Sequence, residues 1–153
     1  MNKTPLAMLW FLLISAAGCA TPLSAVEHNK DVARRAFAEV IETGRLDATN
    51  ELYAAQFRNG KANLQQDMAA LRAWHSVLPP DTTIRPELVL GEGEYVAVLW
   101  TARATDRDRL LTGRGITIWR FENGKIREEW SEFDQERWMR LLGLKTLGDE
   151  SKR

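Results

Sequence analysis

The side chains most able to do chemistry lie in an aromatic and acidic segment, residues 111–134. This segment is divided by Asn123-Gly124, the strongest short signal for a two-residue hairpin turn between strands. If Glu122 pairs with Lys125, strict alternation predicts one shared face for Trp119, Phe121, Ile126, Glu128, Trp130, Glu132 and Asp134. A β-bulge would shift this register by one residue and exchange the faces beyond it.

This predicted face combines aromatic rings with carboxylates. A buried carboxylate is costly unless it is paired, and burial raises its pKa. Aromatic walls with a few polar groups are typical of a small-molecule pocket. We therefore expect Trp119, Trp130, Phe121 and Glu128 to line such a pocket. Glu128 has an alternative, structural role, in which it bonds to the backbone or pairs with an arginine such as Arg103.

Four other residues have both a functional and a structural interpretation. His75 lies on the apolar stripe of a predicted helix, so it is either a pocket base or a histidine of the core or its rim. Tyr53 and Trp100 could line the cavity, although periodicity alone does not place them. Asp134 stands where it could cap a final helix, with Glu136 favourable in the first turn.

The order of elements predicts an α+β domain. Apolar positions at helical spacing indicate helices over residues 29–43, 47–53 and 63–78, with Asn29, Asp47 and Asn63 as N-caps. The period then changes to two, which indicates strands over residues 84–90, 95–105, 111–122 and 125–133. A final amphipathic helix is expected over residues 135–142. Helices followed by a run of strands favour α+β over an alternating fold.

Composition excludes several classes of protein. Lys plus Arg and Asp plus Glu each total 21, so the formal net charge is zero, which argues against a nucleic-acid partner and favours an uncharged ligand. With one cysteine and two histidines in 153 residues, we expect neither an internal disulfide framework nor a metal site.

The N-terminal segment is typical of an export signal. Lys3 precedes the apolar run LAMLWFLLI, and small residues lead to Cys19. The arrangement resembles a bacterial lipobox, which implies lipidation of Cys19 and an anchor in the cell envelope, with the outer membrane favoured. The alternative is an ordinary secretory signal whose cleavage removes Cys19. We accordingly divide the chain into a signal (1–18), a tether (19–28), a domain (29–144) and a polar tail (145–153).

The hairpin sequence GITIWRFENGKI, followed by Glu128, Trp130 and Asp134, resembles the SnoaL-like polyketide cyclases of the nuclear-transport-factor-2-like superfamily. The first helix and the segment RWMRLLGL also fit, so the resemblance covers residues 29–144. It implies a cone-shaped α+β barrel, in which a curved antiparallel sheet wraps around the N-terminal helices. It also implies cofactor-free chemistry, with Asp134 as the general acid or base of a ring closure.

Three hypotheses about function follow. The first is a cyclase, isomerase or hydrolase that acts on a small apolar or aromatic molecule. The second is a non-catalytic protein that binds such a molecule at the cell envelope. The third is a homodimeric assembly domain that pairs through the outer face of the sheet, where Ile116 and Ile118 are expected.

Overall fold

The computed structural model describes residues 24–106, 108–134 and 138. The predicted signal, Cys19 and the polar tail lie outside the described residues, as does most of the predicted final helix. No helix within the described part of the chain is long and apolar enough to cross a membrane.

The first helix begins earlier than the sequence predicts. Helix α1 (Ala25–Arg35) is capped by the Ser24 hydroxyl, which accepts a hydrogen bond from the backbone N–H of Glu27. Asn29 is therefore not the cap but a buried residue inside the helix. The helix continues into a π-helical segment, η1 (Ala36–Ile41). Residues 25–28, predicted as part of the tether, thus form the first turn of α1.

The next helices are short until α3. A 3-10 turn, η2 (Leu46–Ala48), leads into α2 (Thr49–Leu52), and the chain then enters β1 (Tyr53–Asn59), so Tyr53 begins a strand. The predicted cap of α3 (Leu64–His75) is confirmed. The side chain of Asn63 accepts from the N–H of Gln66, whose side chain accepts from the N–H of Asn63.

Six strands form one mixed sheet. After β1 come β2 (Ala62–Asn63), β3 (Thr83–Glu92), β4 (Tyr95–Asp106), β5 (Arg109–Glu122) and β6 (Lys125–Phe133), in the spatial order β2-β1-β6-β5-β4-β3. All neighbours are antiparallel except β1 and β6, which are parallel. The prediction of an α+β fold is confirmed, and the sheet stays open rather than closing into a barrel.

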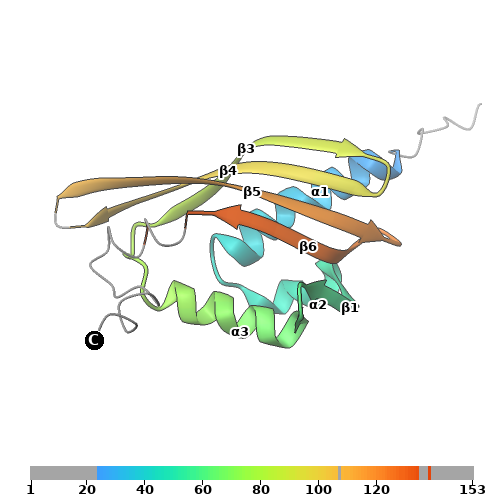
Figure 1. Ribbon diagram of the computed structural model, residues 1–153, viewed down its shortest axis with the longest axis horizontal. Coiled ribbons are helices and arrows are strands. Elements are labelled where there is room, and N and C mark those ends of the chain that lie inside the picture. The colour runs from blue at the N-terminus through green and yellow to red at the C-terminus, as the bar shows by residue number, and fades with distance from the viewer. Residues whose placement is uncertain (1–23, 107, 135–137, 139–153) are drawn as a thin grey trace, which may run out of the picture.

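The helices cover one face of the sheet (Figure 1). Helix α1 packs along β3 and β4, whereas α3 packs against β1. Alternate residues of β4 and β5 therefore point into the core, including Val96, Val98, Trp119 and Phe121. The other face of these strands carries exposed apolar side chains, among them Ile116 and Ile118.

A bulge in β6 changes the face assignment made from the sequence. Phe121 pairs with Ile126 as predicted, but Arg120 pairs with Glu128. Between these two pairs β6 advances by two residues while β5 advances by one. Beyond this point Trp119 lies opposite Glu129 and Ile118 lies opposite Trp130. The predicted inner positions of Glu128, Trp130 and Glu132 are therefore wrong, because the inner side chains after the bulge are Glu129, Ser131 and Phe133.

Candidate functional site

A pocket of about 310 Å³ lies between the helices and the inner face of the sheet. Its apolar walls come from Phe37, Ile41, Met68, Ala70, Leu71, Trp74, Ile84, Trp100 and Phe133. Its polar lining comes from Asn59, Asp67, Thr117, Glu129 and Ser131. We call this site the acidic pocket, because the described residues that line it include two carboxylates and no cationic side chain. Its size is at the lower end of the range for small-molecule sites, which is about 300–1,000 Å³.

Glu129 is held in a fixed orientation by two uncharged donors. The indole Nε1–H of Trp119 donates to Oε2 at 2.8 Å, and the hydroxyl of Ser131 donates to Oε1 at 2.8 Å. Burial raises the pKa of Glu129, the negative charge of Asp67 raises it further, and the two hydrogen bonds oppose the rise. The result is a carboxyl group whose proton affinity is higher than that of an ordinary glutamate.

A row of hydrogen bonds leads from the Trp100 indole through Thr117 and Ser131 to Glu129, and each group donates toward Glu129. The Trp100 indole donates to Oγ1 of Thr117 at 3.0 Å, and this oxygen lies 2.9 Å from Oγ of Ser131. Because Ser131 uses its hydrogen for Glu129, the Thr117 hydroxyl must donate to Ser131. An indole N–H cannot accept a proton, so Trp119 offers Glu129 no acceptor, and the hydroxyl groups of Ser131 and Thr117 lead only to a second indole donor, that of Trp100. Glu129 can therefore exchange its proton with a molecule in the pocket.

Asp67 supplies the second carboxylate from the first turn of α3. Its Oδ1 accepts a hydrogen bond of 2.8 Å from Nδ2 of Asn59, at the end of β1. Burial raises the pKa of Asp67, and the bond from Asn59 opposes this rise. The two carboxylates also affect Tyr53. Burial raises the pKa of Tyr53 well above the ordinary value, and the charges of Glu129 and Asp67 add to this rise.

The wall formed by Trp100 depends on a residue without a side chain. Trp100 of β4 lies opposite Gly115 of β5, and a Cβ at Gly115 would come within 2.2 Å of Cζ2 of the indole. The ring therefore occupies space that only glycine leaves free. From there it contacts Phe37 and Phe133, with ring centroids 6.4 and 5.1 Å away. These rings make one continuous aromatic wall.

Two of the predicted pocket residues lie on the opposite face of the sheet. Trp130 is 50% exposed. Glu128 accepts two hydrogen bonds from Arg120, at 2.8 and 3.0 Å, and this pairing lowers its pKa. The predicted position in the pocket is wrong for both residues, for the same reason: each follows the bulge. The alternative that Glu128 pairs with an arginine is confirmed, with Arg120 in place of Arg103.

The other predicted residues lie at or near the core. Trp119 is fully buried and bonds to Glu129, whereas Phe121 and Tyr53 are core residues outside the pocket lining. His75 donates from Nε2 to the carbonyl of Ile41 at 2.8 Å, which is a structural role at the rim. Asp134 is exposed after β6, and its carbonyl accepts from the N–H of Trp138 as in a helical turn. Its acid–base role stays a prediction.

The sequence interpretation missed Asp67 and Glu129. Asp67 is indistinguishable by pattern from an acidic residue that favours a helix N-terminus. Glu129 had a usable signal: Ile126 and Phe133 are both apolar, yet strict alternation puts residues seven apart on opposite faces. Placing both in the core requires a bulge between them, and that bulge turns Glu129 inward.

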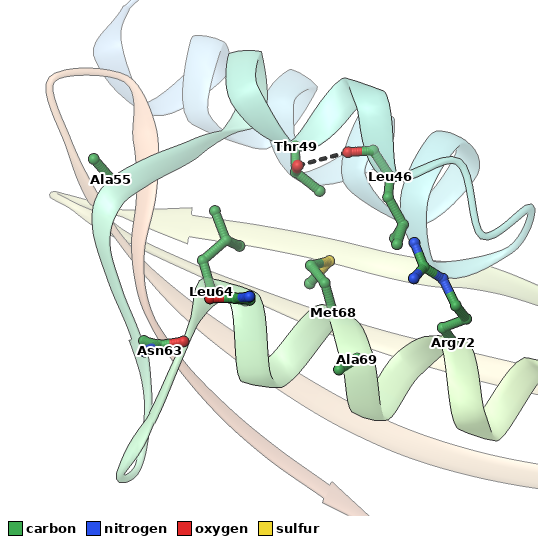
Figure 2. Close-up of a pocket in the computed structure, with 9 residues that line it drawn as sticks. Leu46, Thr49, Ala55, Asn63, Leu64, Met68, Ala69 and Arg72 are labelled. Carbon is green, nitrogen blue, oxygen red and sulfur yellow. Dashed lines mark hydrogen bonds between the residues drawn. The ribbon is translucent and has the colours of Figure 1, made fainter.

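A second, larger depression of about 610 Å³ lies between α3 and residues 46–55. Figure 2 shows Leu64, Met68 and Arg72 along one side of it, facing Leu46 and Thr49. No carboxylate is found among the described residues that line this depression. Across the described residues, no group of three His, Cys, Asp or Glu side chains is arranged to hold a metal ion. The acidic pocket is therefore the stronger candidate for acid–base chemistry.

Comparison with known proteins gives both a family and a fold. The model of the SnoaL-like domain family matches residues 33–129. No curated protein sequence matches the chain significantly. Among solved structures, a candidate polyketide cyclase from Bacillus cereus shares 21% identity at a TM-score of 0.68. That match covers 78% of this chain and 83% of the other.

Two Streptomyces proteins show that related folds are assigned different chemistries. IdmH from Streptomyces antibioticus, a candidate polyketide cyclase, shares 19% identity at a TM-score of 0.64, covering 76% of this chain and 99% of its own. AclR from Streptomyces galilaeus, a candidate hydroxylase, shares 14% identity at a TM-score of 0.63, covering 77% and 97%. At these identities the likeness establishes the fold alone, and the chemistry must be argued from the site.

Proposed function

Because the chain belongs to the SnoaL-like domain family, we propose that it binds a small apolar or aromatic molecule in the acidic pocket and moves a proton on it, with Glu129 as the acid–base group. The observation that carries this proposal is the setting of Glu129. Its carboxyl group lies against the aromatic wall of the pocket, its pKa is raised, and its hydrogen-bond partners Trp119 and Ser131 are uncharged donors, neither of which is a base.

The chemistry needs no cofactor. Ionised Glu129 takes a proton from an acidic carbon or a hydroxyl of the ligand and becomes neutral. It returns the same proton to a second position of that ligand, so the net reaction is an isomerisation or a ring closure. A catalytic carboxyl group works best when its pKa approaches the working pH, which is the effect of burial here. Asp134, exposed beyond Phe133, is the alternative acid–base residue from the sequence resemblance.

A generic proton-abstraction probe tests this proposal. When a base removes the ring C–H proton of nitrobenzisoxazole, the N–O bond breaks and a coloured nitrophenolate forms. A desolvated carboxylate should accelerate this reaction. We expect Glu129→Gln to lose about 10²-fold of the protein-catalysed rate, in keeping with the usual contribution of general-base catalysis.

The matched control is Glu128→Gln, one residue away on the outer face, which should keep the wild-type rate. Asp134→Asn separates the two candidate bases. A wild-type rate in Glu129→Gln contradicts the proposal. A loss confined to Asp134→Asn would transfer the acid–base role to that residue.

Binding without catalysis is the second candidate function, favoured by the aromatic wall of Phe37, Trp100 and Phe133. It predicts a ligand that co-purifies with the chain in native mass spectrometry, together with no acceleration of the probe reaction. A protein that is consistently empty would count against it.

The exposed apolar side chains of the outer sheet face support homodimer formation as a further proposal. Ile116, Ile118 and Trp130 lie there beside charged Arg114 and Glu132, so the face offers a second copy both apolar and complementary charged groups. Light scattering should then detect a dimer that Ile118→Glu disrupts. A wild-type monomer at all concentrations would contradict dimer formation.

The export signal and the lipid anchor at Cys19 are also proposals, based on the sequence. Metabolic labelling with palmitate should modify the wild-type chain and not Cys19→Ser. Labelling that survives this substitution would contradict lipidation at Cys19.

A further inference from the structure

The two carboxylates of the acidic pocket differ from ten carboxylates of the surface in having no counter-charge among the described residues. These ten acidic residues each form an ion pair with lysine or arginine: Glu27, Asp31, Glu39, Glu42, Asp47, Glu51, Glu87, Glu94, Glu122 and Glu128. Within the described part of the chain, neither Asp67 nor Glu129 has such a partner. They accept hydrogen bonds from uncharged groups of Asn59, Trp119 and Ser131.

These two groups also act on each other. The charge of Asp67 raises the pKa of Glu129, so ionising both groups together is unfavourable. A cation in the pocket would remove this cost. Among the described residues, the lining contains no lysine, arginine or histidine, so a cationic ligand would supply this charge.

The walls fit the rest of such a ligand. Trp74, Trp100 and Phe133 line the pocket, and the ring centroids of Trp74 and Trp100 lie 6.3 and 5.1 Å from that of Phe133. Aromatic faces attract ammonium groups and stack on flat rings. A volume of about 310 Å³ limits the ligand to a small molecule.

We propose that the acidic pocket selects a small aromatic or apolar amine in its protonated form, with the ammonium group bound by Asp67 and Glu129 and the apolar body against Trp74, Trp100 and Phe133. This inference rests on the proposed function, since it names the ligand class of the same pocket. The overall neutrality of the chain favours an uncharged ligand, but the local charge of the pocket decides which ligand enters.

The test uses three naphthalene derivatives of nearly equal size, which carry an aminomethyl, a hydroxymethyl or a carboxylate group. Their affinities for the full chain are measured by calorimetry at a pH of about 8, where ordinary carboxyl groups are ionised and the amine is still largely protonated. We expect the amine to bind at least about tenfold more tightly than the alcohol, as charge-assisted hydrogen bonds and cation–π contacts predict. The carboxylate should bind most weakly.

Variants show whether the preference arises in the pocket. Asp67→Asn should reduce the preference for the amine over the alcohol to about threefold or less, and Glu129→Gln should reduce it as well. Asp31→Asn removes one equal charge from the surface of α1 and should leave the preference unchanged. The near-ultraviolet circular dichroism of each variant reports whether the fold is kept.

The outcomes separate this inference from the proposed function. If the alcohol binds as tightly as the amine, or if both pocket variants keep the full preference, the inference is wrong while ligand binding in the pocket stands. If none of the three compounds binds, ligand binding in the pocket is itself contradicted, and the inference fails with it.

Discussion

Glu128 and Glu129 are neighbours in β6, but the two faces of the sheet give them opposite chemistry. Glu128 faces outward, where the Arg120 guanidinium pairs with it and lowers its pKa. Glu129 faces inward, where burial and the charge of Asp67 raise its pKa. The tryptophans of the hairpin divide in the same way: Trp119 is 0% exposed and Trp130 is 50% exposed.

The difference between the faces shows that one extra residue can decide the chemistry of a site. The bulge between the pairs Phe121–Ile126 and Arg120–Glu128 exchanges the faces of β6. Without it, Glu128 would enter the core and Glu129 would reach solvent. The pocket therefore depends on backbone register as much as on residue type.

The largest expected difference between the faces is in packing. Trp119→Ala removes a fully buried indole and the donor to Glu129, so it should lower the free energy of unfolding by about 3–5 kcal/mol. Trp130→Ala should change it by less than about 1 kcal/mol. Urea unfolding of both variants provides the comparison, and similar losses would mean that the faces are assigned incorrectly.

An intermediate effect is expected from the hydrogen-bonded chain behind Glu129. Thr117→Val keeps the shape of the side chain but leaves the buried Trp100 indole without an acceptor, at a cost of about 1–3 kcal/mol. Thr112→Val makes the same change at an exposed position of β5 and should be nearly neutral. Equal stabilities of the two variants would argue against the hydrogen bond from Trp100 to Thr117.

The smallest effect on stability should be a gain. A Glu129→Gln amide can accept from Trp119 and donate to Ser131, and it removes a buried charge. We expect it to be about 0.5–2 kcal/mol more stable than the wild type at neutral pH, in the range of other single stabilising changes.

The sign of the pH dependence follows from the raised pKa of Glu129. The folded protein holds this proton more tightly than the unfolded chain, so the wild type regains stability as the pH falls through the raised value toward 4.5. The advantage of Glu129→Gln should therefore shrink over that interval in thermal melts. An advantage that grows with acidification would contradict burial of the charge.

Local signals predicted much of the fold. The Asn123-Gly124 turn, with positive φ at both residues, and the capping box at Asn63 depend on neighbouring residues, so short sequence patterns contain the required information. The start of α1 was missed because Ser24 and Asn29 are both good N-caps, and packing decides between them. The parallel pairing of β1 with β6 joins segments far apart in the chain, which periodicity does not address.

The site was predicted less well than the fold. Strict alternation predicts carboxylates among aromatic rings beside Trp119, but it places Glu128 and Trp130 there, whereas the structure places Glu129 beside Trp119. Strict alternation of faces fails at a β-bulge. The bulge that follows Ile126 has no glycine or proline that would reveal it in the sequence. Asp67 joins the site only through the packing of α3 on the sheet, which the pattern of α3 itself does not reveal.

The most direct test of this account is the pKa of the two adjacent carboxyl groups. A pH titration of the glutamate side-chain carboxyl carbons by NMR, assigned with Glu128→Gln and Glu129→Gln, measures both in one folded protein. The account predicts that Glu129 titrates above the ordinary value of 4.5 and Glu128 below it. A Glu129 pKa at or below that of Glu128 would contradict the account.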